Sequence, residues 1–257
     1  MTAPALVLLA NGTTDPHVAT TMHSLRKRLQ SMRPDLAINV AFIEHCPPTG
    51  PQVVSALANR GTSEVVLVPV SLTSAIDHRG VDEVVGRVRA AHPTVAVEAA
   101  RPIGPAVELL NLLDERVREA LRNRSVTQLD ALVLAAPAGA DARGTSLLQR
   151  RARQWSAHHK LPVIVAVNDA TGMGTVAAVA SLRAQGRRHI AVGCLWIAAD
   201  EAYVAQARAA EARGAVAVSE PIGCDDRILE LALARYAFAA MALLTSQDEA
   251  EAERIAL

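Results

Sequence analysis

The chain has 257 residues, of which 51% are hydrophobic and only 2% aromatic, and its 26 Lys and Arg residues balance 26 Asp and Glu residues. A neutral chain has no net field to attract nucleic acid or an anionic membrane, and so few aromatic rings cannot build a base-stacking platform. We therefore expect neither nucleic acid nor a membrane as a partner.

Short apolar runs alternate with longer segments of helical period, which is typical of repeated βα units on a parallel sheet. In the first half the predicted strands are 5–10, 38–42, 64–70 and 95–99, and the predicted helices are 18–32, 51–60, 81–91 and 105–122. In the second half the strands are 131–136, 163–167, 190–194 and 216–218, and the helices are 141–157, 173–185, 200–213 and 226–243.

The second half repeats the first. Ala5-Leu6-Val7-Leu8 recurs as Ala131-Leu132-Val133-Leu134, and Pro102-Ile103-Gly104 recurs as Pro221-Ile222-Gly223, each at the same place in its βα unit. Several identities in register indicate a duplication. The sequence therefore predicts an α/β fold of two tandem, doubly wound parallel-sheet domains, 1–123 and 129–244, followed by a frayed helix or tail at 245–257.

The cysteines indicate a reducing compartment. Cys46, Cys194 and Cys224 are far apart and form no CxxC pair, so neither a disulfide framework nor a structural zinc site is expected. The apolar stretch 4–10 lacks the features of a signal peptide, and no later run is expected to reach membrane-spanning length. We expect a cytoplasmic protein.

Polar residues follow three strands of the first half, where ligands bind in open parallel sheets. They are Asn11, Gly12 and Thr13 after the first strand, Glu44 after the second, and Ser74, His78 and Arg79 after the third. Imidazole and carboxylate together suit a divalent transition metal such as Fe²⁺ or Co²⁺, so Glu44 and His78 are the predicted metal donors. His45 or His17 could supply another nitrogen, although surface exposure is the simpler explanation for both. We expect the polar residues of the site to lie in the first half alone.

Nucleotide-binding motifs are absent from the sequence. A dinucleotide fold would place GxGxxG after the first strand, where only Gly12 occurs, and no GxxxxGK[ST] is present. We expect no organic cofactor. His158 and His159 fall at a predicted helix end, where the helix dipole is the simpler explanation for them.

The loops of the first half resemble those of the class II chelatases, the sirohydrochlorin cobalto- and ferrochelatases. Leu9-Ala10-Asn11-Gly12-Thr13-Thr14-Asp15-Pro16 is similar to the family's first strand ending in His-Gly-Ser-Arg-Asp-Pro. Val40 to Glu44 resembles the strand that delivers the family's Glu, and Val68 to His78 resembles the segment that delivers its second His. The second half is similar to the degenerate copy in the long, two-domain members.

The resemblance implies a lyase that inserts Fe²⁺ or Co²⁺ into a metal-free tetrapyrrole in sirohaem or cobalamin biosynthesis. It implies His78, Glu44 and Asn11 as catalytic residues, and Gly12, Thr13, Ser74, Arg79 and Arg101 as substrate-binding residues, with Arg143 a further candidate. Asn11 replaces the family's first His, and an amide is neither a base nor a good metal ligand.

The replacement by Asn11 favours a second hypothesis, a non-catalytic homologue that binds a tetrapyrrole or a metal. A third is a two-lobed small-molecule-binding module of the periplasmic type, which shares the duplicated plan; the missing signal peptide and the His and Glu loops count against it. We expect a monomer, with a homodimer as the alternative.

Overall fold

The first half of the computed structural model is built on a parallel sheet with the strand order β2-β1-β3-β4. The structure describes residues 3–73 and 78–255, without the side chains of 78, 79 and 246–255. In chain order the elements are β1 (Ala5–Ala10), α1 (Pro16–Met32), β2 (Ile38–Phe42), α2 (Gly50–Ala58), β3 (Glu64–Pro69), α3 (His78–Ala91), β4 (Ala96–Ala99) and α4 (Glu108–Asn123).

The second half repeats this plan in a second parallel sheet with the order β6-β5-β7-β8. Its elements are β5 (Ala131–Pro137), α5 (Ala142–His159), β6 (Val163–Asn168), α6 (Met173–Ala184), β7 (Ile190–Cys194), α7 (Glu201–Ala212), β8 (Ala217–Val218) and α8 (Asp226–Ile255). The predicted fold class, two tandem parallel-sheet α/β units, is confirmed.

Strand residues alternate between two buried faces, as a sheet covered on both sides requires. Ala5, Val7 and Leu9 of β1 pack under α2 and α3, whereas Leu6, Leu8 and Ala10 belong to a larger cluster on the opposite face. In the second half, β5 divides in the same way: Ala131, Val133 and Ala135 pack under α6 and α7.

The last helix of each half covers the sheet of the other half. α4 packs against β7 and β8, and α8 packs against β3 and β4. Gly193 of β7 allows the close approach on the α4 side, because a Cβ there would lie 2.7 Å from the Trp155 ring and 3.0 Å from Leu113. On the α8 side the buried Tyr236 hydroxyl donates to the Pro4 carbonyl at 2.7 Å.

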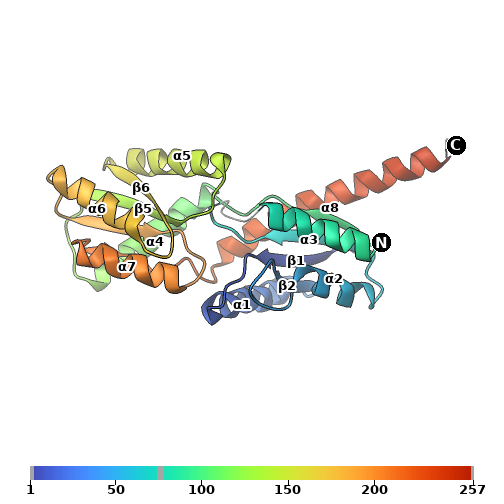
Figure 1. Ribbon diagram of the computed structural model, residues 1–257. Coiled ribbons are helices and arrows are strands. Elements are labelled where there is room, and N and C mark those ends of the chain that lie inside the picture. The colour runs from blue at the N-terminus through green and yellow to red at the C-terminus, as the bar shows by residue number, and fades with distance from the viewer. Residues whose placement is uncertain (1–2, 74–77, 256–257) are drawn as a thin grey trace.

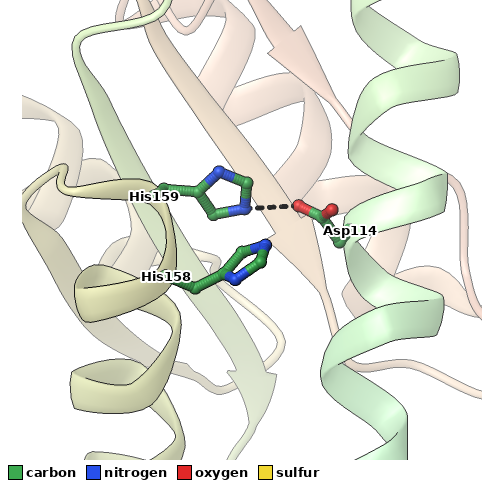
Figure 2. A group of neighbouring side chains, drawn as sticks. All are labelled: Asp114, His158 and His159. Carbon is green, nitrogen blue, oxygen red and sulfur yellow. Dashed lines mark hydrogen bonds and ion pairs between the residues drawn. The ribbon is translucent and has the colours of Figure 1, made fainter.

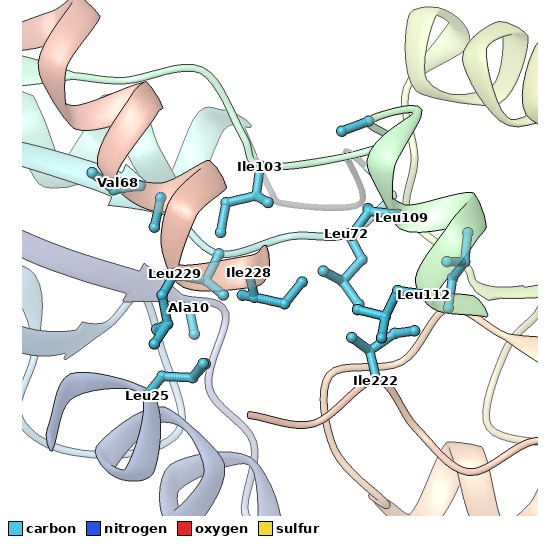
Figure 3. Close-up of a cluster of buried hydrophobic side chains, with 14 of the residues drawn as sticks. Ala10, Leu25, Val68, Leu72, Ile103, Leu109, Leu112, Ile222, Ile228 and Leu229 are labelled. Atoms are coloured by element: carbon cyan, nitrogen blue, oxygen red, sulfur yellow. The ribbon is translucent and has the colours of Figure 1, made fainter. Parts of the chain in front are cut away.

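This exchange joins the inner faces of both sheets into one hydrophobic core. In Figure 3 its side chains run from Ala10 and Leu25, past Ile228 and Leu229 of α8, to Leu109 and Leu112 of α4. Leu72, Ile103 and Ile222, from loops that follow strands, fill the space between the halves. The two halves therefore share a core through residues that are distant in sequence.

The helix α8 runs past its predicted end at residue 243 and continues to Ile255, through the stretch that was expected to be a frayed helix or a tail, and it projects beyond the first half (Figure 1). Its segment Asp226–Thr245 is long and apolar enough to span a membrane by length and composition, although no run of that length was expected from the sequence. Of that segment, 33% is buried. Because α8 packs against β3 and β4, we interpret it as a core helix.

Candidate functional site

The carboxyl ends of β1 and β3 face those of β5 and β7 across a cavity of about 150 Å³. The strand order switches sides between β1 and β3 in one sheet and between β5 and β7 in the other, and ligands bind at such switch points in folds of this kind. We call this space the interdomain cavity. Its polar and loop lining is Asn11, Gly12, Thr13, Ser71, Thr73, Pro137, Ala138, Trp196 and Asp200.

Gly12 allows the first two loops to meet. Its φ of +79° favours glycine, and a Cβ at this position would lie 2.1 Å from the carbonyl oxygen of Glu44. The Glu44 amide donates to the Asn11 carbonyl at 3.0 Å, which fixes the loop after β2 beside the loop after β1. The structure thus brings Asn11, Gly12 and Glu44 together through their backbones.

The predicted side chains differ in where they lie. Asn11 and Thr13 line the interdomain cavity, whereas the Glu44 side chain is 61% exposed and pairs with His45 at 3.1 Å. Ser74 lies outside the described residues, as do the side chains of His78 and Arg79, whose backbone opens α3. The roles of these residues stay predictions.

The second half also contributes polar groups to the cavity, so the expectation that only the first half would do so is wrong. Trp196 is 3% exposed. Its indole Nε1 is buried and has no hydrogen-bond partner in the part of the chain that the structure describes. A buried donor without an acceptor is destabilising, so this position suits a ligand acceptor. Asp200, the N-cap of α7, lines the same cavity.

Two N-cap carboxylates from opposite halves interact near the cavity. Asp15 accepts a hydrogen bond from the His17 amide at 2.8 Å, which holds the pKa of Asp15 below its usual value. The backbone amide of Glu201 also lowers the pKa of Asp15. Burial raises the pKa of Asp200, and the charge of Asp15 raises it further. The cavity therefore contains a carboxyl group that holds a proton more tightly than an exposed aspartate does.

Arg101 lies in a different cavity, of about 440 Å³, together with Arg143, Arg151 and Arg235. We call it the arginine cavity. The loop that carries Arg101 is held beside the interdomain cavity, because the Gly104 amide donates to the Ser71 carbonyl at 2.7 Å. Glu108 and Asp141 also line the arginine cavity, so four guanidinium groups face two carboxylates and the lining is basic. Such a surface suits an anionic group.

The residues that the first half contributes to the site lie within the part of the chain that matches a known family model, CbiX, over residues 5–120. These residues are just under half of the chain, so the first half is similar to the CbiX family. This confirms the resemblance to the class II chelatases that the loops indicated. A search of the curated proteins found no match.

Solved structures of CbiX-type chelatases share the fold over nearly the whole chain. SirB from Bacillus subtilis subspecies spizizenii, a sirohydrochlorin chelatase in complex with cobalt, is 14% identical with a TM-score of 0.76, covering 93% of this chain and 96% of that chain. SirB from Bacillus subtilis with Fe³⁺ is 17% identical with a TM-score of 0.71 and the same coverage of 93% and 96%. CbiX, the terminal enzyme for siroheme biosynthesis in denitrifying bacteria, is 17% identical with a TM-score of 0.56, covering 90% and 98%.

Proposed function

We propose that the protein is a sirohydrochlorin chelatase, which inserts Fe²⁺ or Co²⁺ into a metal-free tetrapyrrole in sirohaem or cobalamin biosynthesis. The observation that carries the proposal is the interdomain cavity, where the strand ends of a half similar to the CbiX family meet those of its copy. Metal insertion exchanges one divalent cation for two pyrrole protons, so a chelatase has to bind an acidic macrocycle, deliver a metal and accept protons.

Binding of the macrocycle requires the walls of the interdomain cavity to move apart locally. At about 150 Å³ the interdomain cavity is smaller than the several hundred Å³ of a usual small-molecule site. On opening, the ring would enter between Asn11 and Trp196, with the Trp196 Nε1 donating to one of its carboxylates. The arginine cavity, next to Ser71 and Leu72, is suited to further carboxylates of the ring.

Metal delivery and proton removal fall to different residues in this proposal. Glu44 and His78 hold the incoming cation, because carboxylate and imidazole bind borderline metals weakly enough to release them. Asn11 orients water or a carboxylate, since an amide takes no proton. Asp200 accepts a pyrrole proton, for which its raised pKa makes it a better base than an exposed carboxylate.

Asn11 also supports a second function, a carrier or regulator that binds the tetrapyrrole or the metal without catalysis. The two functions differ in one measurable property. A binding protein shifts the absorption of sirohydrochlorin on mixing and leaves the spontaneous rate of metal insertion unchanged.

The deciding experiment is an anaerobic absorbance assay with the full chain, sirohydrochlorin and either Co²⁺ or Fe²⁺. The wild type is compared with Asn11→His and Asp200→Asn, and with Asn59→His, an exposed position after α2, as the matched control. We expect the wild type to accelerate insertion, Asp200→Asn to slow it at least about tenfold, as loss of a general base does, and Asn59→His to behave as the wild type. If the wild type shifts the absorption spectrum without accelerating insertion, and Asn11→His restores the acceleration, the protein has the binding function instead.

The cellular setting follows from the same proposal. We propose a cytoplasmic protein without an organic cofactor, in agreement with the free state of Cys46, Cys194 and Cys224. Because the second half supplies the other wall of the cavity, a monomer suffices to form the site.

A further inference from the structure

Three side chains that can bind a metal lie together on the face of the second sheet covered by α4 and α5. Asp114 of α4 is 8% exposed, and His158 and His159 are the last two residues of α5. One ligand atom from each lies within 4.8 Å of the other two. Figure 2 shows both imidazole rings directed toward the Asp114 carboxylate. None of the three lines the interdomain cavity.

The Asp114 carboxylate is already held in place. Its Oδ1 faces the His159 Nε2 at 2.5 Å and accepts a longer bond from the Trp155 indole Nε1 at 3.4 Å, while its Oδ2 pairs with Arg118 at 2.5 Å. The His159 ring packs edge-on against Trp155, with 6.0 Å between ring centroids. Bonds from outer groups that orient a carboxylate and an imidazole are the usual support of a metal site.

The surroundings favour a cation and leave room for its remaining ligands. His158 is exposed, and together with Asp114 it lines a cavity of about 670 Å³. Four carboxylates line this cavity, from Glu108, Asp114, Glu115 and Glu230, against the two guanidinium groups of Arg118 and Arg227. Water in this cavity can complete the coordination of an ion bound by three protein ligands.

We infer that Asp114, His158 and His159 form a second metal site, which binds a divalent transition ion such as Zn²⁺, Co²⁺ or Ni²⁺. Two imidazoles and one carboxylate are a common donor set for these ions, at about 2.0–2.2 Å. The ion would replace the proton shared by His159 and Asp114, and rotation of the exposed His158 ring would bring the third donor to it. The inference does not depend on the proposed chelatase activity.

A metal at this position would link α4, which follows the first sheet in the chain, to α5 of the second half. Both helices cover the same face of the second sheet, and α4 reaches it only through the exchange of helices between the halves. The expected effect of the ion is therefore structural, a rise in Tm on binding, because a ligand that binds only the folded state stabilises it.

The test uses Co²⁺ alone, titrated anaerobically into the chelator-treated full chain and followed by its visible absorption and by the Tm. The parent carries Glu44→Gln and His78→Ala, which remove the metal donors of the proposed chelatase. His158→Gln and His159→Gln are added one at a time. His189→Gln is the matched control, because His189 also faces a carboxylate, Asp130 at 3.7 Å, in the same half.

We expect the parent to bind one Co²⁺ with a rise in Tm, and each of the two variants to weaken binding at least about tenfold, the loss that even outer partners of a metal site cause. His189→Gln should leave binding unchanged. Failure of the parent to bind Co²⁺ would overturn the inference, as would equal binding by His158→Gln. Because His158 is exposed, its replacement does not threaten the fold, so this variant decides the question even if His159→Gln unfolds.

Discussion

Asp15 and Asp200 cap helices in opposite halves of the chain and lie close enough to repel each other. Asp15 is stabilised as a carboxylate by backbone amides of both halves, those of His17 and Glu201. Asp200 is partly desolvated beside it and holds its proton more tightly. The two carboxyl groups therefore place negative charge beside the interdomain cavity, which favours entry of a cation.

Replacing Asp200 by Asn should stabilise the protein at neutral pH. The folded state raises the pKa of Asp200 above its ordinary value of 3.8, so the folded state binds this proton more tightly than the unfolded chain does. The associated stability is present at pH values below 3.8 and is lost as the pH rises through the folded pKa. Asn keeps the cap without the charge, so we expect the Tm to rise by about 1–2 °C at pH 7.5, and the gain to shrink toward pH 4.

Thermal unfolding followed by circular dichroism at several pH values measures this difference. Asp141→Asn at the exposed N-cap of α5 is the control and should give no comparable gain. A constant gain across the pH range would contradict the assignment to the Asp200 charge.

Replacing Trp196 by Phe should separate binding from stability. Trp196→Phe and Trp155→Phe remove the same atoms from buried sites, but the Trp155 Nε1 donates to Asp114 whereas the Trp196 Nε1 has no acceptor in the described part of the chain. Trp196→Phe should therefore be less destabilising by about 1–2 kcal/mol in urea unfolding. It should weaken sirohydrochlorin binding about tenfold in fluorescence titrations. Equal affinity for the wild type and Trp196→Phe would exclude a ligand role for this nitrogen.

Replacing Gly12 by Ala should disrupt the loop that carries Glu44. At Gly61 the φ of +86° makes Ala strained, but no atom lies within 4 Å of the added Cβ, so Gly61→Ala should cost only about 1 kcal/mol. At Gly12 the φ is also positive, and the added Cβ meets the Glu44 carbonyl at 2.1 Å. We expect Gly12→Ala to lower the free energy of unfolding by about 2 kcal/mol more than Gly61→Ala. If Gly12→Ala and Gly61→Ala lower the free energy of unfolding by the same amount, the loop after β2 can shift to accommodate the added Cβ without cost.

The first predicted domain should not fold alone. Residues 1–123 include α4, which packs on the second sheet, and lack α8, which covers β3 and β4. We expect this fragment to show no cooperative thermal transition, because the β3 and β4 part of the inner face of its sheet is uncovered. Co-expression with residues 124–257 should restore the transition and yield a complex of the two fragments on size-exclusion chromatography. A cooperative transition of the fragment alone would contradict this expectation.

The sequence predicted the elements well because strand and helix periods differ so clearly in this chain. Strands β1, β2 and β7 have the predicted bounds, and α1 begins two residues earlier than predicted because Asp15 caps it. The exchange of α4 and α8 could not be predicted, since an apolar helix face does not specify which of two similar sheets it covers. For residues 245–257 the sequence left a frayed helix or a tail open, because they lack an apolar stripe, and α8 continues as a helix to Ile255.

The candidate site was predicted in part. Asn11, Gly12 and Thr13 were found because they follow the first strand directly, and they do line the interdomain cavity. Trp196 was missed because it lies in a loop of apolar residues, and Asp200 was missed because it looks like an ordinary helix N-cap. The duplication was the available signal, since the segment after β7 corresponds to the segment after β3, where site residues were sought.

The exchange of the last helices reverses the order in which the two sheets can be completed during synthesis. The second sheet receives its covering helix α4 before its first strand has been made, so it is complete once β8 and the helices between its strands have emerged. The first sheet is made earlier but waits for α8, at the end of the chain. Until then the apolar face of β3 and β4 lacks its covering helix, and exposed apolar surface of this kind is prone to aggregation.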